Sequence, residues 1–163
     1  MKGSKAITSL ILVILCGAIL QLIFINVDER ETPTKVVAEF SKAYFKLDRS
    51  MGNWLCGDIV ENEDIDVVGQ YLNKTAQEAE ALGYDICYMR THLFQIAAYV
   101  ISQDENSAEV RIVAKRKRLI NPVFTLVAKI FLIGEEYHLD ETIRVIKENG
   151  EWKVCGQPYS LVI

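Results

Sequence analysis

The sequence predicts an α+β fold in which a single N-terminal transmembrane helix precedes helices packed on a curled antiparallel sheet. Three observations support this prediction. Residues 6–27 contain no charged residue, an amphipathic helical periodicity follows them, and the second half of the chain changes to an alternating, strand-like period. Helical segments followed by a run of neighbouring strands are typical of α+β domains, and a chain of 163 residues has room for one.

The uncharged run predicts a membrane anchor. Its 22 residues would form a helix of about 33 Å, which matches a hydrocarbon core of roughly 30 Å. A cleaved signal peptide is the alternative, but its apolar stretch would be about 7–15 residues long. This run continues well past its only cluster of small residues, at positions 16–18. We therefore expect an uncleaved helix.

The flanking charges predict the orientation of that helix. Lys2 and Lys5 precede the run, whereas acidic residues predominate just after it. The positive-inside rule then puts the N-terminus in the cytoplasm and the C-terminal domain in the periplasm or an equivalent space. The expected organisation is a cytoplasmic tail (1–5), a single-pass inner (plasma) membrane helix (6–27), a linker (28–32) and an extracytoplasmic domain (33–163).

The domain is expected to begin with two amphipathic helices. Thr32 suits an N-cap and Pro33 suits the first helical position. An apolar stripe follows at helical spacing and consists of Val36, Val37, Phe40, Ala43, Tyr44 and Leu47. A short helix or turn is expected over residues 50–58 and a long helix over residues 64–82, after which Gly83 suits the left-handed cap.

From Leu93 onward the period predicts an antiparallel meander. Strands are expected over residues 93–102, 107–118, 123–133, 137–148 and 151–156. Asn149-Gly150 predicts a type I′ hairpin between the last two strands. The stretch over residues 123–133 is almost continuously apolar, so we expect both of its faces to be covered.

Two stretches of the chain resemble the nuclear transport factor 2-like (cystatin-like cone) superfamily. They are TPTKVVAEFSKAYFKLD and IRVIKENGEWKVCG, and the order of elements between them agrees. The layout is similar to membrane-anchored extracytoplasmic members, which include bitopic subunits of type IV secretion systems and proteins associated with lipid import. This cone-shaped fold serves enzymes, binding modules and scaffolds, so the resemblance implies a fold and no single function.

Enzymes with this fold typically place an acid or a base inside the cone, so the resemblance implies a candidate pocket. The residues that would line it are Tyr44, Asp58, Tyr84, His92 and Tyr99. The alternative is that the tyrosines pack in the core or at its rim and that Asp58 caps a helix or turn. We expect no cofactor and no metal, because His92 and His138 lie on separate strands without clustered ligands, and no phosphate-binding or dinucleotide motif is present.

Three cysteines lie outside the apolar run. We expect a disulfide between Cys56 and Cys87, which would join the helical layer to the start of the sheet. The alternative is that these two and Cys155 are reduced and buried.

Association with other molecules is expected from two segments. The apolar strand offers Val123, Phe124, Leu126, Ile130 and Phe131, and the only basic run is Lys115, Arg116, Lys117 and Arg118. That run would contact lipid headgroups or an acidic partner, or simply form a solvated hairpin end. A formal net charge of −4 gives no basis for nucleic-acid binding.

These features favour a non-catalytic accessory or scaffolding subunit of an envelope complex. Its partners would be membrane lipid and other membrane or envelope subunits, or a second copy of the chain. The first alternative is a binding module that holds a small apolar or lipid ligand in the cone. The second is an isomerase- or dehydratase-like enzyme.

Overall fold

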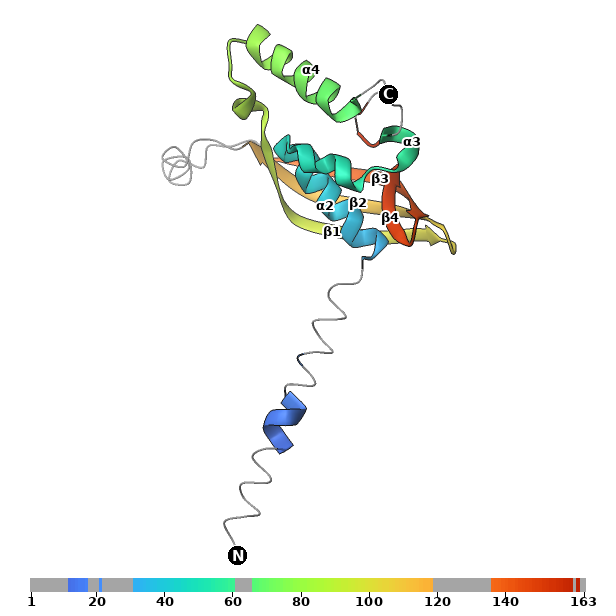
Figure 1. The fold of residues 1–163 in the computed structure, drawn as a ribbon. Coiled ribbons are helices and arrows are strands. Elements are labelled where there is room, and N and C mark those ends of the chain that lie inside the picture. Colours follow the sequence, from blue (N-terminus) through green and yellow to red (C-terminus); the bar gives the residue numbers. More distant parts are fainter. Residues whose placement is uncertain are drawn as a thin grey trace, which may run out of the picture. The chain divides into compact units, whose positions relative to one another are not determined.

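The computed structural model describes residues 12–17, 21, 31–60, 66–118, 136–159 and 161. The chain divides into two compact units, Met1–Glu31 and Thr32–Ile163. The second unit contains all the helices and strands labelled in Figure 1, where α2 lies against one face of a sheet and α4 lies on the same side. It is an α+β unit with a four-stranded antiparallel sheet among the described residues.

The structure corrects the prediction of a membrane anchor. Within the described residues, no helix combines the length and the apolar character that crossing a bilayer requires. The predicted transmembrane helix over residues 6–27 is therefore wrong, as is the single-pass inner-membrane location with a periplasmic domain that was inferred from it.

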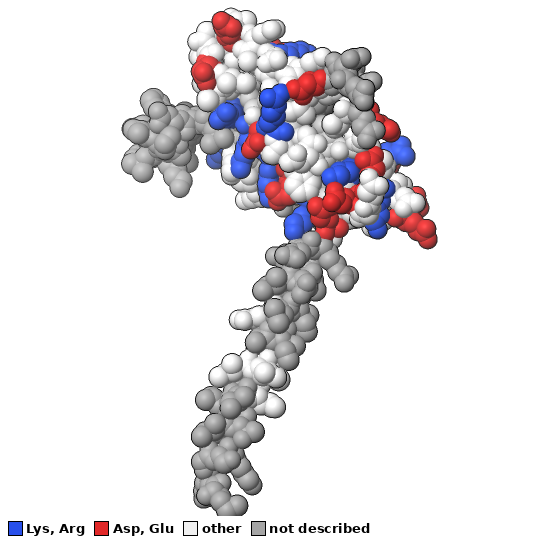
Figure 2. All heavy atoms as spheres, in the orientation of Figure 1, with Lys and Arg blue, Asp and Glu red and all other residues white. Residues whose placement is uncertain are grey.

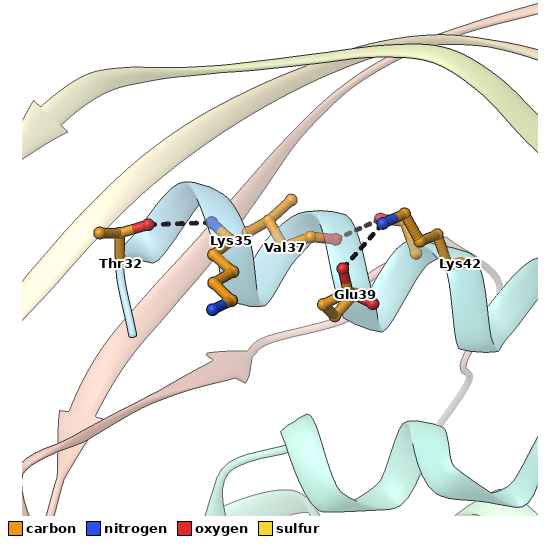
Figure 3. A network of polar contacts seen from close by, with 6 residues as sticks. Thr32, Lys35, Val37, Glu39 and Lys42 are labelled. Carbon is orange, nitrogen blue, oxygen red and sulfur yellow. Dashed lines mark hydrogen bonds and ion pairs between the residues drawn. The ribbon is translucent and has the colours of Figure 1, made fainter. Parts of the chain in front are cut away.

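Helix α2, Pro33–Lys46, begins as its sequence predicts. The Thr32 side chain accepts a hydrogen bond from the Lys35 amide at 3.2 Å, and Glu39 and Lys42 form an ion pair of 2.7 Å one turn later (Figure 3). All six residues of the predicted apolar stripe are buried. The helix ends at Leu47, whose φ of 55° is left-handed and whose amide donates to the Tyr44 carbonyl at 3.0 Å.

Short elements follow α2: the 3₁₀ helix η1 (Arg49–Trp54) and the one-turn helix α3 (Gly57–Val60). The second long helix, α4, covers Val67–Ala81, and the 3₁₀ helix η2 covers Ile86–Met89. Helix α4 ends in a Schellman motif, because the Tyr84 amide donates to Ala79 at 2.9 Å and the Gly83 amide donates to Glu80 at 2.8 Å. Gly83 has a φ of +76°, so the predicted left-handed cap is confirmed.

The sheet is a meander of β1 (Thr91–Gln103), β2 (Ser107–Arg118), β3 (Tyr137–Glu148) and β4 (Glu151–Cys155). Among the described strands, neighbours pair in sequence order, so β1 and β4 are the two outer strands of these four. Asn149 and Gly150 have φ values of 51° and 91°, as a type I′ hairpin requires. The predicted strand over residues 123–133 lies outside the described residues.

The core lies between α2 and one face of the sheet. Alternate residues of β2, β3 and β4 point into it, and Val110, Ile112, Val145 and Val154 are fully buried. The opposite face of the sheet is polar: the Arg111 guanidinium makes two hydrogen bonds to the Asp140 carboxylate, at 2.7 and 2.6 Å. This alternation is the predicted one, and along β2, β3 and β4 it points successive side chains toward the helices or away from them. In β1 it is interrupted by register shifts between Phe94 and Ala97 and between Val100 and Ser102.

The disulfide joins Cys56 to Cys155, whose Cα atoms are 5.4 Å apart, so the predicted Cys56–Cys87 pair is wrong. Cys87 is exposed and free. The physical reason is local backbone pairing. Leu55 forms a parallel bridge with Val154, and the Cys56 amide donates to the Val154 carbonyl at 2.9 Å. The crosslink therefore joins the helical layer to the last strand instead of the first.

Candidate functional site

A pocket of about 370 Å³ lies between α4, the C-terminal end of α2, η2 and the adjoining ends of β1 and β2. Its size is in the range of small-molecule sites, which occupy about 300–1,000 Å³. Leu47 and Met89 contribute apolar surface. All of its lining residues belong to the second unit, Thr32–Ile163.

Aromatic rings form one wall of this pocket. Tyr44 on α2 stacks on Tyr71 of α4 with their centroids 4.8 Å apart, and it meets the edge of Phe45 at 5.1 Å. Tyr44 and Phe45 are only 4% and 8% exposed, so their positions are fixed by packing. They are adjacent residues at the end of the buried stripe of α2, which is why both reach the space under α4.

Tyr159, near the C-terminus, supports this wall from behind. Its ring lies 4.8 Å from that of Tyr44 and 5.0 Å from that of Phe45. Its hydroxyl lies 2.6 Å from the Oγ of Ser41, a fully buried residue that itself donates to the Val37 carbonyl at 2.6 Å. Because the Ser41 proton is used there, the Tyr159 hydroxyl donates to Ser41. Burial raises the pKa of Tyr159 above its ordinary value.

Arg116 supplies the most constrained positive charge at the pocket. Its guanidinium carbon lies 5.5 Å from the centroid of Phe45 and 5.2 Å from that of Tyr137, so two rings hold it. Arg116 is half-buried, and within the described part of the chain it forms no ion pair. The neighbouring Lys115 and Lys117 both pair instead with Glu136.

The other polar lining residues come from α4 and β1. Lys74 and Glu78 are exposed on α4 and place one charge of each sign at the rim. The Thr75 hydroxyl donates to the Tyr71 carbonyl at 2.9 Å, and the Thr91 hydroxyl donates to the Phe45 carbonyl at 3.4 Å. Both threonine protons are therefore engaged by backbone, which leaves the guanidinium as the constrained donor of the site.

Burial also raises the pKa of Tyr71 above the usual range of a phenol, and the adjacent Tyr44 adds to this effect. The phenol of Tyr71 therefore keeps its proton at neutral pH and does not act as a base.

Of the residues predicted to share a pocket, only Tyr44 lines this one. Asp58 lies in the first turn of α3, and His92 is exposed on β1. Tyr84 is 48% exposed and stacks on Tyr88, with their centroids 4.3 Å apart, beyond the end of α4. Tyr99 is 60% exposed on β1. The structure does not bring these four together.

Two residues of the pocket were missed or assigned another role. Tyr71 was not singled out, because a single tyrosine on an amphipathic helix gives no signal of its own. Arg116 was assigned to a basic interface, yet it has the same parity as the buried Ile112 and Ala114 of β2. Continuing that alternation would have placed Arg116 on the inner face. The predicted apolar interface residues, Val123, Phe124, Leu126, Ile130 and Phe131, lie outside the described residues.

The surface around the domain carries charges of both signs. On the face seen in Figure 2, positive and negative side chains are interspersed. Because the charges on that face are mixed, they do not form a field of one sign that would attract a charged ligand. Binding of such a ligand there would depend on contacts with individual side chains.

No protein-family model matches this chain, and no curated protein matches it in sequence. The resemblance to the nuclear transport factor 2-like superfamily therefore stays a prediction.

Proposed function

We propose that residues 32–161 form a binding domain for a small amphiphilic molecule with an anionic group, such as a carboxylate, on an aromatic or apolar body. One observation carries this function: the pocket combines an aromatic wall with a constrained guanidinium that has no ion pair within the described residues. Ligand sites combine apolar surface with a few placed polar groups. In this pocket polar atoms contribute more of the exposed lining than apolar atoms do, and the aromatic wall supplies apolar surface beside the guanidinium.

The two parts of the pocket would do different work. Tyr71, which is half-buried, offers apolar contact to the body of the ligand, and the buried ring of Tyr44 supports it from behind. Arg116 offers a planar fork of donors, which suits a carboxylate or phosphate better than a lysine ammonium does. Its contacts with Phe45 and Tyr137 hold the guanidinium before any ligand arrives, so less entropy is lost on binding.

The size of the pocket favours a molecule with one or two rings, or a short acyl chain, over a large lipid. At about 370 Å³ it is near the lower end of the range for ligand sites. Catalysis has weaker support, because the buried phenols of Tyr71 and Tyr159 have raised pKa values and hold their protons. The scaffolding role depended on the transmembrane helix, which is contradicted, and on the apolar residues 123–133, which lie outside the described residues. Association through residues 123–133 stays a prediction.

Matched pairs of acids and amides test this function. Purified full-length chain is mixed with naphthoate, benzoate or octanoate, and in parallel with the amide of each compound, and the Tm is followed. We expect at least one acid to raise the Tm and its amide to have a much smaller effect, because only the acid gives the guanidinium a charged acceptor. Equal shifts from acid and amide, or no shift with any acid, would contradict the proposed function.

Variants then locate the effect. Arg116→Gln should weaken binding about 10- to 100-fold, since a hydrogen bond to a charged group contributes about 1.5–3 kcal/mol. Arg116→Lys should recover part of that loss. Lys42→Ala is the matched control, because Lys42 is a cation on the exposed side of α2 that pairs with Glu39 and does not line the pocket.

A further inference from the structure

A second group of chemically reactive side chains lies away from the pocket. Cys56, Cys155 and Glu148 come from the segment before α3 and from the ends of β4 and β3, and their sulfur and carboxylate atoms all lie within 4.8 Å of one another. Cys56 is 1% exposed, whereas Glu148 and Cys155 are half-buried. No local sequence pattern marks this group, because Cys155 is 99 residues from Cys56 and 7 residues from Glu148.

Glu148 is held in place by backbone. Its Oε2 accepts a hydrogen bond of 2.9 Å from the Gly57 amide, immediately after Cys56. Cys56 is in turn fixed to β4 by the hydrogen bond from its own amide to Val154. Main-chain hydrogen bonds, together with the disulfide, therefore hold the carboxylate and the two sulfur atoms close to one another.

We propose that this cluster is a redox-controlled metal site, which is a disulfide when oxidised and binds a thiophilic divalent cation of the Zn²⁺ class when reduced. Two thiolates and one carboxylate are ligand types that Zn²⁺ accepts, and three protein ligands leave a fourth tetrahedral position for water. The Cα atoms of the cysteines are 5.4 Å apart in the disulfide, and the backbone contacts described above keep them close once the bond is broken. The metal would then replace the disulfide as the link between the helical layer and β4.

The chemistry balances with a dithiol as the reductant. The dithiol gives two electrons and two protons, the Cys56–Cys155 bond breaks into two thiols, and the reductant becomes a cyclic disulfide. Each thiol then loses its proton to solvent as its thiolate binds the metal, so metal binding releases two protons. Glu148 supplies its other carboxylate oxygen to the metal, and its Oε2 keeps the hydrogen bond from the Gly57 amide.

Cobalt provides the readout. The full-length chain is reduced with a dithiol, freed of reductant without air, and titrated with Co²⁺, whose bond to thiolate gives a charge-transfer absorption. We expect one Co²⁺ per chain, no band before reduction, and displacement by Zn²⁺. Zn²⁺ should also raise the Tm of the reduced chain. The absence of a band or of a rise in Tm in the reduced chain would overturn the proposal, including in the case where reduction unfolds the protein.

Variants distinguish this site from nonspecific binding of Co²⁺ by cysteine thiols. Glu148→Gln should weaken Co²⁺ binding at least about tenfold. Removing a residue that only hydrogen-bonds to a metal ligand already costs about 10- to 100-fold in affinity, and Glu148 would be a ligand itself. Cys155→Ser should abolish the two-thiolate band. Cys87→Ser is the matched control, because Cys87 is a free, exposed cysteine on η2. If the Glu148→Gln variant bound like the wild type, or if Cys87→Ser lost the band, the site would not be the one proposed.

Discussion

The Tyr159 hydroxyl lies 2.6 Å from the Oγ of Ser41, although the two residues are 118 positions apart in the chain. This contact packs the C-terminal segment on α2, directly behind the aromatic wall of the pocket. Tyr159 lies on the helical side of the sheet, where Ser41 gives it the buried partner that its hydroxyl requires.

Removing one partner of this contact should cost more than removing both. Ser41→Ala leaves a buried phenol without an acceptor, so we expect the free energy of unfolding to fall by about 1–3 kcal/mol. In the double variant with Tyr159→Phe, part of that loss should return, because neither group is then left unsatisfied. Urea unfolding of the two single variants and the double variant measures the coupling. Strictly additive losses would show that the two hydroxyls do not depend on each other.

The disulfide should stabilise the fold through β4. The disulfide closes a loop between residues 99 positions apart. The chain-entropy model predicts a stabilisation of about 4–5 kcal/mol for a loop of this size, and losses measured on removing native disulfides are commonly about 2–5 kcal/mol. Cys155→Ser should therefore lower the Tm and make it insensitive to a metal-free reductant. Cys87→Ser should leave the Tm unchanged, because Cys87 is exposed and free. A linked peptide containing Cys56 and Cys87 in non-reducing mass mapping would contradict the pairing.

Acid should destabilise the start of α4. The Gly69 amide, together with Arg49, lowers the pKa of Asp66 below its ordinary 3.8. Because folding lowers this pKa, the stabilisation is present above the unfolded pKa and is lost as the pH falls through the folded value. Asp66→Asn keeps a capping oxygen but no charge. Aspartate carboxylates become protonated between about pH 5 and pH 3. Over this interval we expect the urea midpoint of the variant to fall less than that of the wild type.

Glu105→Gln is the matched control for that experiment. Glu105 is an exposed carboxylate in the turn between β1 and β2, away from α4. Its removal should leave the acid dependence as in the wild type. An Asp66→Asn variant with an unchanged acid profile would show that the cap does not contribute through its charge.

Helix α4 should open more readily than α2. Helix α2 packs on all four strands and on η1, whereas the main contacts of α4 are with η1 and η2. Local stability follows such differences in packing. Hydrogen exchange should therefore be faster for the amides of Leu72–Ala79 than for those of Val37–Tyr44, and a pocket ligand should slow it. Equal protection of the two helices in the free protein would mean that α4 is packed more firmly than its contacts indicate.

Much of the second unit was predictable because local rules and burial agree there. The cap at Thr32, the stripe that includes Phe40 and the left-handed Gly83 fix the two long helices. Alternation along β2 and the hairpin at Asn149 fix the strands and their faces. In each of these cases the residue that gives the signal is close in sequence to the structure it determines.

What the sequence could not show depends on contacts between distant segments. The pairing of Cys56 with Cys155 follows from the bridge between Leu55 and Val154, which no local pattern encodes. The pocket likewise needs Tyr71 to stack on Tyr44 across two helices. The membrane prediction was wrong for a different reason: it depended on the composition of the run over residues 6–27 alone, and within the described residues no helix is long and apolar enough to cross a bilayer.

Calorimetric titration of the best carboxylate into the wild type and into Arg116→Gln tests ligand binding in the pocket most directly. We predict one site per chain in the wild type, and a 10- to 100-fold weaker affinity, as an approximate range, in the variant. The Lys42→Ala chain should bind like the wild type. An affinity that does not change when the guanidinium is removed would contradict the assignment of this pocket as an anion-binding site.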